Sequence, residues 1–337
     1  MSSPGEYEIP LPELEQIWHQ DIKPILFATL TTTARPLAGF VGAQPGAGKS
    51  RAMRRLEDLY PDRTFVPLDS DELRKFHPRL DDILATNPAR MPVLTNQAAS
   101  AWFRMGLAQA RAQRCDVLIE NSFHNADIVL AEAQRFKDAG YQTHAIALAV
   151  PSRDSRLGAL TRYVDALAAG ETARWTNLAS HQAGYTGVPA TVAALESSPT
   201  IDRITVTDRA GQIHYDHPHD PGRWPDGRRI LDQIRDTPPT PEEAQAWLDS
   251  WTAVTARISE LPTFDNTAAQ PLLEALNAVA YTLTDAAETV SKRSGSPFHR
   301  FDAMSDTLDS LGEHDNSSFE SIDPAEGHRP PTAGPKL

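Results

Sequence analysis

A glycine-rich segment at residues 42–50 carries residue types that can hold a nucleoside triphosphate. It reads GAQPGAGKS, follows an apolar run typical of a buried strand, and fits G-x-x-x-x-G-K-[ST] except for Ala43 at the first glycine position. Backbone N–H groups of such a loop cradle phosphates, the lysine reaches the β- and γ-phosphates, and the hydroxyl ligates Mg²⁺. The alternative is an ordinary glycine-rich turn between a strand and a helix. The predicted nucleotide-binding residues are Gln44, Pro45, Gly46, Ala47, Gly48, Lys49 and Ser50, with Ser50 as the metal ligand.

Carboxylates follow two other expected strands. Asp71 comes just after the strand expected at 64–68, where a kinase needs a carboxylate that orients and deprotonates an acceptor hydroxyl. Its alternative role is a helix N-cap, which Asp69, Ser70 and Asp71 all suit. Glu120 ends an apolar strand expected at 115–120, where an unpaired carboxylate is costly to desolvate. Two roles stay open for Glu120: holding Mg²⁺ through water, or holding the acceptor.

Cations are also needed, because phosphoryl transfer places charge on the equatorial oxygens. Arg162 and Arg174 are expected on helices beyond the strand at 143–150, where a lid would lie. The alternative for each is a solvated helix face. His77 and His124 lack the ligand spacing of a zinc site, and Cys115 is expected to be an inert core residue.

The elements that position these residues alternate between strand and helix. Apolar strands expected near 37–41, 64–68, 115–120 and 143–150 are separated by helices expected at 49–60, 95–113 and 126–139. This order predicts an α/β fold, a P-loop kinase-like parallel sheet flanked by helices, with a C-terminal helical extension. Ligands of such sheets bind at the carboxyl ends of the strands, which would bring the phosphate loop, Asp69, Asp71, Glu120 and Ser122 to one rim.

The rest of the chain has weaker signals. A helix is expected at 11–30, kinked or ended at Pro24, then a turn-rich segment at 81–92, helices at 152–169 and 189–196, and a hairpin around 210–211. Two further amphipathic helices are expected at 240–261 and 268–293. The predicted organisation is a helical segment at 1–36, a kinase domain at 37–235, a helical extension at 236–293 and a disordered tail at 294–337.

The composition of the chain argues against several classes of protein. The 337 residues carry a formal net charge of −13, which argues against a nucleic-acid-binding surface. One cysteine excludes an intramolecular disulfide and fits a reducing compartment. No signal peptide or membrane-spanning apolar run is evident, so a cytoplasmic protein without a membrane partner is expected.

Together these motifs resemble the zeta toxins, the phosphotransferase components of epsilon/zeta toxin–antitoxin systems. The resemblance covers about 37–215 and rests on AQPGAGKS, LDSDELRKFHP, VLIENS and the series Arg162-Tyr163, Ala173-Arg174 and His181. It implies a P-loop kinase that phosphorylates a sugar hydroxyl of UDP-N-acetylglucosamine, using ATP or GTP with Mg²⁺, and so blocks peptidoglycan synthesis. It also implies a possible antitoxin partner.

The resemblance assigns roles residue by residue. Lys49 becomes the phosphate-loop lysine and Ser50 the Mg²⁺ hydroxyl. Asp71 becomes the general base, and Arg162 and Arg174 become the clamp over the transferring phosphate.

The departures from the family pattern lie on the acceptor side. Glu120-Asn121-Ser122 replaces the family's Glu-Gly-Thr, the basic residue two places on is His124, and Arg104 stands where the family has an acid. The predicted acceptor-binding residues are Asp71, Arg104, Glu120, Ser122 and His124.

Three functions therefore remain open: a nucleotide-sugar kinase, a kinase of another nucleotide or hydroxylated metabolite, and a nucleotide-dependent switch or binding protein. The extension could be a packed appendage, an oligomerisation element or a fused inhibitory segment.

Overall fold

The computed structural model describes residues 4–29, 31–86, 88–171, 173–220, 226–262 and 264–294. By its contacts the chain divides into two compact units, Met1–Ala287 and Glu288–Leu337. The architecture below is that of the first unit. The tail for which we predict disorder lies outside the described residues from position 295 onward.

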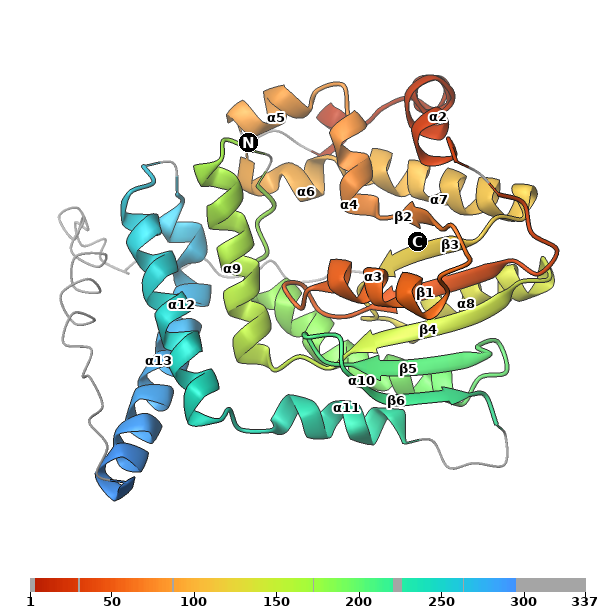
Figure 1. The fold of residues 1–337 in the computed structure, drawn as a ribbon. Coiled ribbons are helices and arrows are strands. Elements are labelled where there is room, and N and C mark those ends of the chain that lie inside the picture. The colour runs from red at the N-terminus through yellow and green to blue at the C-terminus, as the bar shows by residue number, and fades with distance from the viewer. Residues whose placement is uncertain are drawn as a thin grey trace, which may run out of the picture. The chain divides into compact units, whose positions relative to one another are not determined.

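A six-stranded sheet forms the centre of this unit (Figure 1). The strand order is β2-β3-β1-β4-β5-β6, in which β1 to β5 are parallel and β6 is antiparallel to β5. The carboxyl ends of β1 to β5 therefore share one edge, as the alternation of strands and helices predicts. The strands are β1 (Leu37–Gly42), β2 (Val66–Leu68), β3 (Val117–Asn121), β4 (Gln142–Leu148), β5 (Arg203–Thr207) and β6 (Ile213–Pro218).

Both faces of the sheet are covered by helices, so the central strands are mostly apolar, and β1 is apolar throughout. Side chains alternate across a strand, and in β1 Phe40 belongs to one core cluster and Val41 to another. The cluster of Val41 packs on α3, whereas the cluster of Phe40 includes residues of α7, α8, α10 and α11. These helices are α3 (Lys49–Leu59), α7 (Asn96–Gln113), α8 (Ala126–Asp138), α10 (Leu178–Glu196) and α11 (Gly227–Asp236).

The N-terminal segment packs on α7. Its elements are η1 (Pro4–Tyr7), α1 (Leu11–Ile17), a π-helical turn η2 (Trp18–Ile22) and α2 (Lys23–Leu26). Trp102 of α7 is fully buried there, and its indole N–H donates to the Leu14 carbonyl at 3.0 Å. Pro24 lies inside α2, directly after the π-helical turn, where the regular hydrogen-bond ladder is already interrupted.

Sequence predictions of secondary structure are wrong at residues 81–92 and at Pro189. Residues 81–92 are helical, in α5 (Leu80–Thr86), η4 (Pro88–Arg90) and α6 (Met91–Leu94), because Ile83 and Leu94 among others bury a separate apolar cluster. Pro189 does not begin a short helix but lies inside the single helix α10. Tertiary packing outweighs the local polar and proline signals in both places.

The C-terminal extension contains α12 (Pro241–Ser259) and α13 (Asn266–Ser294). A capping box between Thr240 and Glu243 fixes the start of α12. Figure 1 shows α12 alongside α9 (Ser152–Ala168), and the Trp247 indole N–H donates to the Arg153 carbonyl there at 3.3 Å. In the described part of the chain, none of the helices combines the length and apolar character that crossing a membrane requires.

Candidate active site

The phosphate loop joins β1 to α3 and can be formed only with glycine at two positions. Gly46 and Gly48 have φ of +76° and +92°, in the left-handed region. A Cβ added to Gly46 would lie 2.0 Å from the Ser155 carbonyl oxygen of α9. The loop therefore fits closely against α9, and the free N–H groups at the start of α3 lie beside it.

A buried polar chain holds the other end of the loop. The side-chain amide of Gln44 donates to the Val150 carbonyl at 2.8 Å and to the Ser155 hydroxyl at 3.2 Å. That hydroxyl is 2.8 Å from the His181 Nε2 atom, and burial lowers the pKa of His181 to about 4, which keeps the ring neutral. The Gln44 side chain thus anchors the loop to α9 and α10, and its contribution to phosphate binding would come from the backbone.

Lys49 lies among charged groups from three parts of the chain. Its Nζ is 3.4 Å from Oε1 of Glu120 in β3 and 3.5 Å from the Ala43 carbonyl. Burial lowers the pKa of Lys49, the Glu120 charge opposes this, and the nearby charges of Arg174 and Arg162 lower it further. The amine is therefore close to both of the arginines that the sequence selects as a phosphate clamp.

The structure separates the two roles weighed for Asp71. The N-cap of α4 (Ser70–Leu73) is Asp69, whose carboxylate accepts the Asp71 N–H at 2.8 Å. The Asp71 carboxylate is thereby left for other partners. Its Oδ1 accepts from Arg74 Nε at 3.1 Å, and its Oδ2 forms an ion pair with Arg174.

Arg74 also belongs to the site, although no sequence motif points to it. It begins η3 (Arg74–Phe76), is buried, and donates from one Nη1 atom to the Pro92 carbonyl and the Thr95 hydroxyl, both at 2.7 Å. These bonds fix the guanidinium that holds Asp71. The sequence signal that could have identified Arg74 is its i, i+3 spacing from Asp71 on one helical turn.

The segment that carries Arg174 differs from the prediction. Arg162 is on α9 as expected, but Arg174 lies in a non-helical stretch before α10. From this non-helical stretch the Arg174 side chain forms its ion pair with Asp71. Both arginines nevertheless lie near Lys49, because the charge of each lowers the Lys49 pKa.

The loop after β3 covers the start of the phosphate loop. The Phe123 ring lies where a side chain at Gly42 would be, since an added Cβ would be 1.9 Å from the ring. This contact places Glu120 next to the loop. Further along, the Ser122 hydroxyl and His124 Nδ1 are hydrogen-bonded to each other.

Arg104 is placed apart from these contacts. It is exposed on α7, and it forms no hydrogen bond or ion pair within the described ranges. The structure therefore forms two ion pairs at the site, Lys49 with Glu120 and Arg174 with Asp71, whereas the acceptor assignment of Arg104 stays a prediction.

Asp69, for which the sequence suggests only a helix N-cap, lies in an unusual electrostatic environment. Burial raises the pKa of its carboxyl to about 7, and the Glu120 charge raises it as well, against the opposing charge of Lys49. Asp69, Glu120 and Lys49 thus form one electrostatic cluster at the ends of β2 and β3.

The Asp69 carboxyl predicts a specific pH dependence of stability. Its folded-state pKa of about 7 lies above its usual value of 3.8, so the folded chain binds more protons than the unfolded chain between these values and loses stability as pH rises through them. Asp69→Asn keeps the capping oxygen but removes this titration. Without nucleotide or Mg²⁺, we expect the Tm of the variant minus that of the wild type to be larger at pH 8 than at pH 5, measured by circular dichroism.

The exposed acid Asp81 provides a matched control, because Asp81→Asn should leave this Tm difference nearly independent of pH. An Asp69→Asn difference that is the same at both pH values would contradict the assignment.

The residues present fit an Mg²⁺ ion held mainly by a nucleotide. Within the described ranges, no group of three or more His, Cys, Asp and Glu side chains could hold a metal ion by itself. Mg²⁺ in kinases takes one or two protein ligands together with phosphates and waters. Ser50 is exposed at the start of α3, and Asp69 and Glu120 lie near Lys49, so protein oxygens border the phosphate position.

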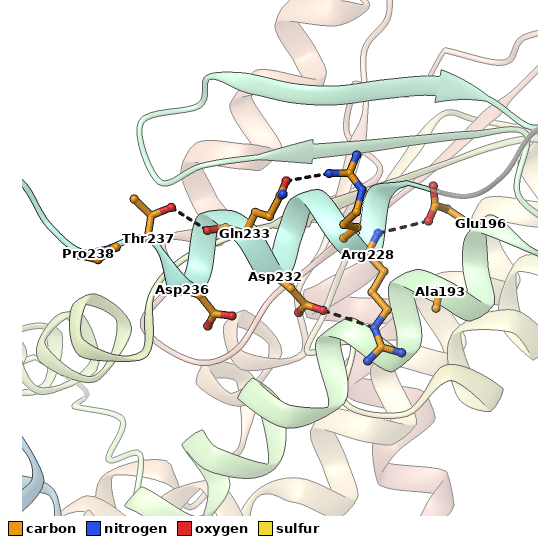
Figure 2. Close-up of a pocket in the computed structure, with 9 residues that line it drawn as sticks. Ala193, Glu196, Arg228, Asp232, Gln233, Asp236, Thr237 and Pro238 are labelled. Carbon is orange, nitrogen blue, oxygen red and sulfur yellow. Dashed lines mark hydrogen bonds and ion pairs between the residues drawn. The ribbon is translucent and has the colours of Figure 1, made fainter.

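A cavity of about 700 Å³ between α10 and α11 is separate from this cluster (Figure 2). None of the predicted site residues lines it. Several of its charged groups have partners at the start of α11: Arg228 Nε is 3.4 Å from an Asp232 oxygen, and Glu196 accepts the backbone N–H groups of Gly227 and Arg228. These pairs support the start of α11 and show no chemistry of their own.

Comparisons with known proteins point to one family. The family model of the zeta toxins matches residues 25–219. Toxin zeta of Streptococcus pyogenes is 23% identical over 177 residues, which cover 52% of this chain and 61% of that protein. Toxin zeta of Enterococcus hirae is also 23% identical over 177 residues, or 62% of its length. The chain thus spans about three fifths of the length of these relatives.

Solved structures share the fold. A structure from the PezAT chromosomal toxin–antitoxin system of Streptococcus pneumoniae has a TM-score of 0.63 at 18% identity, covering 77% of this chain and 100% of that one. The AvrRxo1-ORF1:-ORF2 complex gives 0.51 at 12% identity, over 82% and 91% of the two chains. The family match covers more than half of this chain and includes the phosphate loop, Asp71, Glu120 and both clamp arginines. The chain therefore belongs to the zeta toxin family, a family of kinase-like phosphotransferases.

Proposed function

We propose that this chain is an ATP-dependent kinase that transfers the γ-phosphate to a sugar hydroxyl of UDP-N-acetylglucosamine. The observation that carries the proposal is the position of Arg174 near both halves of a kinase site. Arg174 forms an ion pair with Asp71, and its charge also lowers the pKa of Lys49 in the phosphate loop. A carboxylate and a phosphate-binding amine with one arginine near both suit an in-line transfer between a hydroxyl and a γ-phosphate.

In the proposed reaction Asp71 accepts the proton of the acceptor hydroxyl as its oxygen attacks the γ-phosphorus. A new oxygen–phosphorus bond forms, the bond to the β-phosphate oxygen breaks, and ADP leaves. Arg74, held by Pro92 and Thr95, keeps the Asp71 carboxylate oriented. Lys49, Arg162 and Arg174 offset the charge on the transferring group. Bound Mg²⁺, with Ser50 as a ligand, would neutralise charge on the β- and γ-phosphates.

The choice of acceptor rests on the family resemblance around Asp71, Glu120 and Ser122. Another nucleotide or hydroxylated metabolite is the second candidate, and a specific observation favours it: Arg104, Asn121 and His124 depart from the family pattern on the acceptor side. A helical antitoxin is a further proposed partner, supported by family membership and by the toxin–antitoxin system named for one structural relative.

Mass spectrometry of the reaction products tests the acceptor. Purified protein is incubated with ATP, Mg²⁺ and UDP-N-acetylglucosamine, and in parallel with a small-molecule cell extract. We expect a mass gain of one phosphate on the sugar nucleotide. Phosphorylation of a different extract component, with the sugar nucleotide unchanged, would instead support the second candidate.

A further inference from the structure

A cleft of about 1350 Å³ lies between α9, the β5–β6 hairpin and α12. Its wall includes both charges and apolar groups, among them Asp154, Leu157, Arg162, Arg209 and Trp247. The volume exceeds the several hundred Å³ that a small organic ligand needs. Mixed lining of this kind suits a ligand that combines a flat apolar ring with polar hydroxyl groups.

Two residues that line the cleft, Gly158 and Arg209, also pack against the phosphate loop. Gly158 lines the cleft, and a Cβ added to Gly158 would be 2.6 Å from the Gly46 carbonyl oxygen in the loop. Arg209 of the hairpin also lines it and passes about 3.8 Å from the Cβ position of Gly48, while its guanidinium donates to the Asp154 carbonyl at 2.8 Å. Gly158 and Arg209 therefore contact the loop and line the cleft, so they stand between the two.

The strand order gives the direction in which a donor nucleotide would extend. Asp71 and Glu120, on the acceptor side, follow or end β2 and β3, on one side of β1 in the sheet. The cleft is bounded by α9, which follows β4, and by the β5–β6 hairpin, on the other side of β1. A triphosphate in the loop with its γ-phosphate toward Asp71 would therefore direct its nucleoside toward the cleft.

Helix α12 contributes a second, distinct face to this cleft. One face of the helix carries the buried side chains of Trp247, Trp251 and Ile258. The neighbouring stripe of small or charged residues lines the cleft, and it consists of Glu243, Ala246, Ser250, Ala253 and Arg257. The spacing of these residues follows the helical repeat. Arg257 also forms an ion pair with Asp165 of α9, which fixes α12 at this position.

We propose that the base and ribose of the donor nucleotide bind in this cleft, so that α12 is a wall of the nucleotide site. Helix α12 lies beyond residues 25–219, the part that the family model matches. The extension then helps to select the donor, instead of only packing on the kinase fold. This inference rests on the proposed function, because it assumes that the loop holds a nucleoside triphosphate.

The test places a large side chain on α12 so that it fills part of the cleft. Ala246→Trp and Ala253→Trp place a large side chain at exposed, cleft-lining positions, whereas Ala256→Trp is a matched control at an exposed position outside the lining. Isothermal titration calorimetry measures the binding of Mg²⁺·ATP and of Mg²⁺·tripolyphosphate, which has no nucleoside. We expect both cleft variants to bind ATP about tenfold or more weakly, with tripolyphosphate binding and the control unchanged.

ATP binding by both cleft variants that equals that of the control would overturn the proposal. Equal weakening of ATP and tripolyphosphate would also overturn it, because the substitution would then act on the phosphate loop. Failure of the proposed function gives a different pattern, in which ATP binding responds to the cleft variants but no acceptor is phosphorylated.

Discussion

Replacement of Asp71 by asparagine is expected to lower the rate of phosphoryl transfer by roughly 10²–10⁴-fold, the usual contribution of a general base. The amide keeps the size of the side chain and can still accept from Arg74, but it cannot take the proton of the acceptor hydroxyl. Because Asp71 does not cap α4, the helix start at Asp69 stays intact. ATP binding should therefore survive, which calorimetry can measure beside the turnover of the chosen acceptor.

Asp81→Asn is the matched control for this variant, since Asp81 is an exposed acid on the short helix α5. It should leave turnover unchanged. Full activity of Asp71→Asn on the acceptor identified by mass spectrometry would exclude Asp71 as the base.

Lys49→Ala is the second substitution with a large expected effect, and it should impair binding and catalysis together. The amine sits at the phosphate loop, 3.4 Å from Glu120, with Arg162 and Arg174 nearby. Its removal takes away a cation that interacts with the phosphates in both the bound state and the transition state. We expect a loss of turnover of about 10²–10³-fold, the scale seen for one preorganised stabilising group, together with weaker ATP binding.

The exposed Lys75, which pairs with Glu72 on the surface, provides the control Lys75→Ala. It should retain both properties. A Lys49→Ala protein that binds Mg²⁺·ATP as tightly as wild type would show that the loop does not hold the triphosphate as described.

Much of the fold follows from local sequence. Buried strands such as β1 are continuous apolar runs, and the left-handed turns of the phosphate loop require Gly46 and Gly48. Parallel strands place their carboxyl ends at one edge, which is why Asp71 and Glu120 could be expected near the loop before any coordinates.

What the sequence does not predict depends on contacts between distant segments. The helices at 80–94 exist because Ile83 and Leu94 bury a cluster together with Tyr7 from the N-terminus. The role of Arg74 depends on acceptors at Pro92 and Thr95, about twenty residues away. The cleft depends on α12 returning to α9, which no local pattern encodes.

The central claim is that the bound nucleotide donates its γ-phosphate to a small molecule. The most direct measurement uses γ-³²P-labelled ATP, Mg²⁺ and a small-molecule cell extract, followed by separation of the labelled products. The account predicts one labelled low-molecular-weight product, formed by the wild type and absent with Asp71→Asn. Label that remains in ATP or appears only as inorganic phosphate would contradict the account and favour a nucleotide-dependent switch.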